Sequence, residues 1–193
     1  GGAGAPLPGE VVLSIPNLIT LARILLVPVV VWAIAAGAMH LAFLLFLVAA
    51  ISDGVDGFLA KRFDMRTDLG AYLDPLADKV MIVSIYVTLA STGVIPLWIV
   101  ILVVSRDIMI VGGIMLSWII GNPIAIRPHI VSKVNTAAQI IYACLVLALY
   151  GYGFNAEPLL TLVMVLVAVL TLLSVAFYVA AWVRHMNSAE AGS

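Results

Sequence analysis

Apolar runs of about twenty residues follow one another along almost the whole chain, and they constrain the fold more than any other feature. About 20 apolar residues are needed for an α-helix to cross the hydrocarbon core of a bilayer. Of the 193 residues, 64% are hydrophobic and 10% are charged, whereas an average soluble domain has about 45–50% and 25%. We therefore expect an all-α, polytopic membrane protein.

The runs can be placed along the chain, where short turns join them. We expect six transmembrane helices, covering residues 14–37, 41–62, 69–90, 97–120, 134–150 and 159–182. We expect three parts of the chain from this assignment. They are a short lead, which we expect to derive in part from cloning (1–13), one membrane domain (14–186) and a polar tail (187–193).

The positive charges fall on one side of this predicted bundle. Six of them fall on the side shared by the second–third loop, the fourth–fifth loop and the C-terminus: Lys61, Arg62, Arg66, Arg127, Lys133 and Arg184. The loops at 37–40, 91–95 and 151–157 contain no Lys or Arg. Since cytoplasmic loops carry the excess of Lys and Arg, both termini are expected on the cytoplasmic side. No basic cluster of the kind that binds nucleic acid is present.

A single acid-rich stretch, residues 53–78, interrupts the apolar pattern. It reads DGVDGFLAKRFDMRTDLGAYLDPLAD and contains six aspartates. Intramembrane carboxylates are costly and usually mark a functional site. Asp53 and Asp56 are three residues apart, and Asp74 and Asp78 are four apart, so each pair shares one helix face. We assign the other two aspartates, Asp64 and Asp68, to the polar turn.

The two pairs lie on consecutive predicted helices, joined tightly enough for the pairs to face each other. Four carboxylates at this density are suitable ligands for one or two hard divalent cations such as Mg²⁺, Mn²⁺ or Ca²⁺. Metal ions near a membrane surface suggest displacement at a phosphate. A cation or proton-coupled transporter is the alternative, but its ligands are usually near the midplane, often in repeated halves.

The spacing D-x2-D-G-x2-A-K-x8-G-x3-D-x3-D, from Asp53 to Asp78, resembles the signature of the CDP-alcohol phosphatidyltransferases. The one departure is Lys61, where the family usually has arginine; lysine keeps the charge but loses the bidentate fork. The aspartates open to the side that carries the positive charges, so we expect the active site on the cytoplasmic side, between the second and third helices. The resemblance implies a reaction in which an acceptor hydroxyl attacks a CDP-linked lipid and releases CMP.

The resemblance assigns roles to the motif residues. Two divalent ions, Mg²⁺ or Mn²⁺, would be bound by Asp53, Asp56, Asp74 and Asp78, and Asp78 would also be the base for the acceptor hydroxyl. Five residues would contact the CDP-lipid donor: Asp53, which is also a metal ligand, Gly57, Ala60, Lys61 and Gly70. The small residues of this region also suit ordinary helix packing.

Segments outside the motif bear on the acceptor. Four of them resemble segments of the CMP-forming cardiolipin synthases of mitochondria and related bacteria: IPNLITLARI, LDPLADK, SRDIMIVGG and IVSKVNTAAQ. This implies CDP-diacylglycerol as donor and phosphatidylglycerol as acceptor. Phosphatidylglycerophosphate synthases, which use glycerol 3-phosphate, share similar segments and remain the alternative.

Both acceptors are anionic, so a cationic subsite is expected. Its candidates are Arg23, Arg106 and Lys133, with Arg106 held in place by Asp107, while Lys79 would balance the aspartates. The resemblance further suggests a homodimer. We expect the protein in the bacterial inner membrane with its site facing the cytoplasm, and the mitochondrial inner membrane is the second possibility.

Overall fold

A computed structural model describes residues 15–62, 68–119 and 130–190, which form six α-helices without a β-strand. The helices are α1 (Ile15–Ala35), α2 (Met39–Arg62), α3 (Asp68–Ser91), α4 (Leu97–Ile119), α5 (Ile130–Tyr152) and α6 (Glu157–Glu190). The predicted all-α class is confirmed. Side chains of residues 15–18, 53–76, 114, 116–119 and 185–190 lie outside the description.

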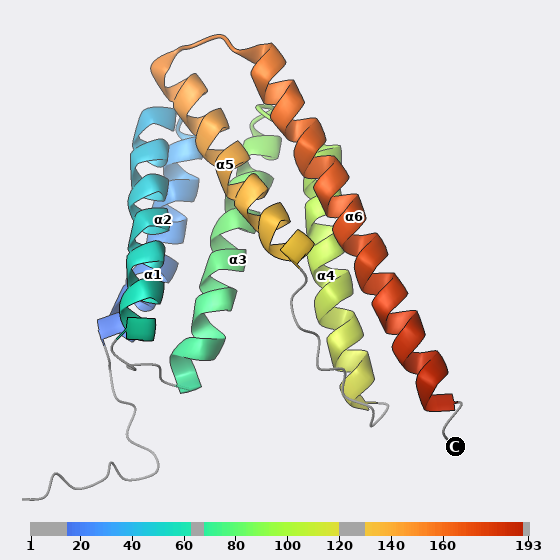
Figure 1. Cartoon of the computed structure of the whole chain (residues 1–193). Coiled ribbons are helices and arrows are strands. Elements are labelled where there is room, and N and C mark those ends of the chain that lie inside the picture. The colour runs from blue at the N-terminus through green and yellow to red at the C-terminus, as the bar shows by residue number, and fades with distance from the viewer. Residues whose placement is uncertain (1–14, 63–67, 120–129, 191–193) are drawn as a thin grey trace, which may run out of the picture.

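The helices alternate in direction, so that the N-terminus of α1 and the C-terminus of α6 lie at the same end of the bundle (Figure 1). Helix α3 is central, because it packs against α1, α4 and α5. Helix α5 crosses in front of α3 and connects the α1–α2 side with the α4–α6 side (Figure 1). The motif-bearing end of α2 and the start of α3 come to one end of the bundle.

Three tight turns close the opposite end of the bundle. Gly37, Gly93 and Gly153 follow α1, α3 and α5 with φ of 75°, 75° and 70°, a left-handed conformation that glycine adopts without steric cost. The residue after each glycine donates its backbone N–H to a carbonyl five residues earlier, at 2.8 to 2.9 Å. This is the bond of a Schellman motif, which satisfies the last carbonyls of a helix.

The core is formed by apolar side chains from all six helices. Helix α3 contributes its largest part, with Ile85, Tyr86 and Leu89 almost completely buried. Outside the core, many large apolar side chains are exposed, including Leu162, Leu166 and Leu172 of α6. Exposed apolar surface of this extent marks contact with a membrane or a partner.

Length and composition single out two of the described helical segments, Ile130–Tyr152 and Glu157–Arg184, as able to cross a membrane. Shorter apolar stretches, Ile19–Ala35 and Met39–Ser52, lie within α1 and α2.

Two helix boundaries differ from the expected spans by four residues or more, and the others differ by one or two residues at most. Helix α5 begins at Ile130 rather than at residue 134, so Ser132 and Lys133 lie on the helix and not in the loop before it. Helix α6 continues to Glu190, past the predicted end of its apolar run at Trp182. No Gly or Pro interrupts residues 183–190, and Ala, Met, Arg and Glu all have high helix propensity.

Candidate active site

The acidic motif is divided between two helices. Asp53, Asp56, Gly57, Ala60 and Lys61 belong to the last part of α2, and Gly70, Asp74 and Asp78 to the first half of α3. The predicted placement of the motif on consecutive helices is confirmed. Of these side chains only that of Asp78 lies within the description, so the predicted approach of the two aspartate pairs lies outside it.

Asp78 forms an ion pair with Arg23. The Arg23 Nη1 atom of α1 lies 2.5 Å from Asp78 Oδ1 of α3. The side chain of Arg23 is 4% exposed, whereas that of Asp78 is 39% exposed. The cation is therefore buried behind a carboxylate that other groups can still reach.

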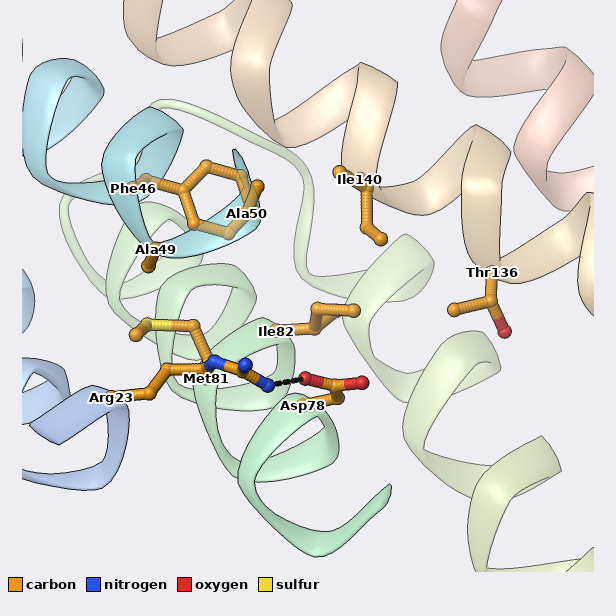
Figure 2. A pocket seen from close by; sticks show the side chains of 9 residues that line it. All are labelled: Arg23, Phe46, Ala49, Ala50, Asp78, Met81, Ile82, Thr136 and Ile140. Carbon is orange, nitrogen blue, oxygen red and sulfur yellow. Dashed lines mark hydrogen bonds and ion pairs between the residues drawn. The ribbon is translucent and has the colours of Figure 1, made fainter. Parts of the chain in front are cut away.

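A cavity of about 150 Å³ lies beside this ion pair, between α1, α2, α3 and α5 (Figure 2). Arg23, Asp78 and Thr136 supply its polar groups. The rest of the lining is apolar: Phe46, Ala49, Ala50, Met81, Ile82 and Ile140. A cavity with one charged end and apolar walls is suited to an amphipathic molecule.

A second polar cluster, which we call the Arg106 cluster, consists of Lys79, Arg106, Asp107, Ser132 and Ser174. Arg106 donates from Nη1 to Asp107 Oδ1 at 2.7 Å, which confirms the predicted contact between these two residues. Ser174 of α6 accepts from Nε at 3.2 Å and from Nη2 at 2.9 Å, and Ser132 of α5 accepts from Nη2. Arg106 is thus buried and joins α4, α5 and α6.

Lys79 of α3 completes the Arg106 cluster. Its Nζ atom lies 2.7 and 2.6 Å from the two carboxylate oxygens of Asp107. Lys79 was expected to balance the aspartates of the motif, and in the structure Asp107 is its partner instead. Lys133 lies exposed in the first turn of α5, next to Ser132. Arg106 and Lys133, two of the three cations predicted to bind the acceptor, therefore lie near one another. The third, Arg23, is bonded to Asp78 instead.

The sequence did not indicate the polar contacts between these helices. Ser132 and Ser174 accept hydrogen bonds from Arg106. Thr171 of α6 donates to Asn135 Oδ1 of α5 at 3.0 Å. Gln139, one turn after Asn135, is completely buried, and its side-chain amide has no hydrogen-bond partner within the described residues. Isolated polar residues in apolar helices could have signalled these contacts, since such residues often hydrogen-bond across a helix interface.

Asp78 offers hard oxygen atoms of the kind that Mg²⁺ and Mn²⁺ prefer. The described residues contain no group of three or more His, Cys, Asp or Glu side chains that could hold a metal ion, and the side chains of the other three motif aspartates lie outside the description.

The sequence matches the CDP-alcohol phosphatidyltransferase family over residues 13–186. The chain belongs to this family.

Named relatives fall into two groups. The chain is 32% identical to the human cardiolipin synthase (CMP-forming) over 164 residues, which are 77% of this chain and 54% of the human protein. It is also 32% identical, over 143 residues, to the CDP-diacylglycerol–glycerol-3-phosphate 3-phosphatidyltransferase of Bacillus subtilis; the match covers 66% of this chain and 73% of that protein. A rice chloroplastic enzyme of this second name is 30% identical over 184 residues, 86% of this chain and 56% of the rice protein. The chain spans about half the length of the cardiolipin synthases it matches.

Proposed function

We propose that this protein transfers a phosphatidyl group from CDP-diacylglycerol to phosphatidylglycerol, forming cardiolipin and releasing CMP. The geometric observation that carries the proposal is the apolar cavity that ends at Asp78 and Arg23. It is suited to part of a lipid whose polar group reaches the Asp78 carboxylate. The named relatives of the first group are CMP-forming cardiolipin synthases, which supports cardiolipin and CMP as the products.

In the proposed reaction, an acceptor hydroxyl oxygen forms a bond to the phosphorus that carries diacylglycerol. The bond between this phosphorus and the phosphate oxygen of CMP breaks, and CMP leaves with the electron pair. Asp78 accepts the hydroxyl proton, a role for which a partly exposed carboxylate beside the cavity is suited. Gly57, Ala60, Lys61 and Gly70 would bind the donor.

Two Mg²⁺ or Mn²⁺ ions would be bound by the four motif aspartates, Asp53, Asp56, Asp74 and Asp78. Such ions would neutralise negative charge on the phosphate oxygens. In this proposal Arg106 and Lys133 attract the anionic acceptor. Arg106 is fixed by Asp107, Ser132 and Ser174, and Lys133 is exposed one residue from Ser132. Arg106 would then be the oriented hydrogen-bond donor, and Lys133 would be a positive charge on a flexible side chain.

The membrane arrangement is part of the same proposal. All six helices would cross a bacterial inner membrane, with the motif on the cytoplasmic side and a second copy completing a homodimer. The loops without Lys or Arg coincide with the three glycine-capped turns at the end opposite the motif, which agrees with the positive-inside rule.

Phosphatidylglycerophosphate synthesis is the second candidate. The relatives from Bacillus subtilis and rice favour it, because their names specify glycerol 3-phosphate as acceptor. An acceptor of this kind is water-soluble and would need only the cationic groups.

CMP release tests the proposal. The purified protein is incubated in lipid nanodiscs with CDP-diacylglycerol, Mg²⁺ or Mn²⁺, and either phosphatidylglycerol or glycerol 3-phosphate. We expect CMP release that depends on phosphatidylglycerol. Release with glycerol 3-phosphate alone would support the second candidate and reject cardiolipin synthesis. No release with either acceptor would reject both.

A further inference from the structure

Arg23 is a buried cation on an otherwise apolar helix. Within the same turns of α1, Val27 and Val30 are buried and Leu25 is exposed. A charged side chain at such a depth needs a partner that outweighs its loss of hydration. Asp78 provides that partner, 55 residues further along the chain.

Two consecutive residues of α3 are bonded to two different helices. Asp78 pairs with Arg23 of α1 at 2.5 Å, and Lys79 pairs with Asp107 of α4 at 2.6 Å. Consecutive residues of an α-helix point about 100° apart, because 3.6 residues form one turn. Two ion pairs in different directions therefore restrict the rotation of α3 about its axis at the level of Asp78.

Arg23 extends from α1 across the cavity wall, and its guanidinium group ends at the Asp78 carboxylate (Figure 2). The guanidinium is planar and presents its donors in a fixed fork, so it orients a carboxylate better than an ammonium group does. A carboxylate has about four acceptor positions. The bond to Arg23 is therefore compatible with a further proton or metal contact at Asp78.

We propose that Arg23 is a positioning residue for Asp78 rather than a binding residue for the acceptor. The inference rests on the proposed function, in which Asp78 accepts the proton of the acceptor hydroxyl. Arg23 holds the carboxylate beside the cavity, and the Lys79–Asp107 pair keeps α3 in the matching rotation. Arg23 is bonded to the proposed base itself, whereas Arg106, which is equally buried, is bonded to Asp107 and lies near the exposed Lys133.

A positioning role predicts a specific kinetic pattern. Replacing Arg23 with methionine keeps much of the side-chain volume but removes the ion pair. In the variant R23M, we expect kcat to fall about tenfold or more, since small misplacements of a reacting group can cost up to about 10²-fold. The KM for phosphatidylglycerol is expected to stay within about twofold. In R23K, which keeps the charge without the fork, part of the lost kcat is expected to return.

The control is R184Q on α6, which removes a cation that is exposed and bonded to the Ala180 carbonyl of its own helix. Its kcat and KM are expected to match those of the wild type. A rise in the acceptor KM of R23M with unchanged kcat would assign Arg23 to acceptor binding and overturn the inference. Unchanged kinetics in R23M would also overturn it.

A second measurement is independent of activity. The melting temperatures of R23M, D78N and the double variant R23M/D78N are compared in detergent. We expect each single variant to melt lower than the wild type, and the double variant to lose less than the sum of the two. Additive losses would contradict the pairing on which the inference rests.

The same experiments separate this inference from the proposed function. If wild-type protein releases no CMP with any acceptor, the proposed function fails, and a role for Arg23 in that reaction fails with it. If wild-type protein is active and R23M is equally active, only the inference about Arg23 fails.

Discussion

At the scale of single residues, each buried charge in the described part of the bundle has a defined partner. Arg106 illustrates this, because Asp107, Ser132 and Ser174 surround its guanidinium group. Unpaired charges are costly inside a protein. A cation held in this way is already oriented, so under the proposed function its loss would affect both helix packing and acceptor binding.

We expect Arg106→Ala to raise the KM for phosphatidylglycerol about 10- to 100-fold, which corresponds to a lost charge-assisted contact of about 1.5–3 kcal/mol. The KM for CDP-diacylglycerol is expected to change much less. Ser174→Ala is the matched control, since it removes one partner of Arg106 and no charge. Steady-state kinetics with each substrate varied in turn measure the difference. The opposite order of effects would remove Arg106 from the acceptor subsite.

Asp78→Asn is expected to lower kcat by about 10²–10⁴-fold, because an amide cannot take the proton of the acceptor hydroxyl. The variant is expected to retain some binding of the CDP-lipid, because the other donor-binding residues are unchanged. Turnover is measured by CMP release, and binding by equilibrium titration with CDP-diacylglycerol. Turnover equal to that of the wild type would exclude Asp78 as the base.

At the scale of helices, close contacts at the glycine-capped end determine how the bundle is held together. Gly151 of α5 packs against the start of α2, and a Cβ atom there would lie 2.7 Å from the backbone N of His40. In the same region His40 Nε2 lies 3.1 Å from the Tyr152 hydroxyl. Small residues permit such close approach of helix backbones in membranes.

Gly151→Ala is therefore expected to destabilise the bundle, although alanine has the higher helix propensity by about 1 kcal/mol. The added methyl group would force the backbones of α2 and α5 apart. Gly112→Ala on α4 is the control, because a Cβ there meets no atom within 4 Å. Melting temperatures in detergent should fall for the first variant and stay equal or rise for the second. Equal melting temperatures would show that the α2–α5 contact can relax.

At the scale of the whole molecule, the apolar pattern was sufficient to predict the helical class and the order of the six helices. Turn positions also followed from sequence, since Gly37, Gly93 and Gly153 lie in predicted loops. The extent of α6 did not follow, because the end of an apolar run does not end a helix that contains good helix formers. Apolar runs therefore locate the helices better than they locate the helix ends.

The candidate site was only partly predictable, because its contacts join helices that are far apart in the sequence. Local spacing identified Asp78 and the contact between Arg106 and Asp107, which are neighbours in sequence. The Arg23–Asp78 pair joins residues 55 positions apart, and Ser174 is 68 positions from Arg106. Such contacts depend on how each helix is rotated in the bundle, which single-sequence periodicity does not specify.

Transfer of an intact phosphatidyl group to phosphatidylglycerol can be followed directly by isotope tracing. Unlabelled CDP-diacylglycerol and phosphatidylglycerol with deuterated acyl chains are supplied to the protein with Mg²⁺, and the lipid products are analysed by mass spectrometry. We predict cardiolipin with one deuterated and one unlabelled diacyl half, formed together with an equal amount of CMP. Cardiolipin with both halves deuterated, or CMP release without labelled cardiolipin, would contradict this prediction.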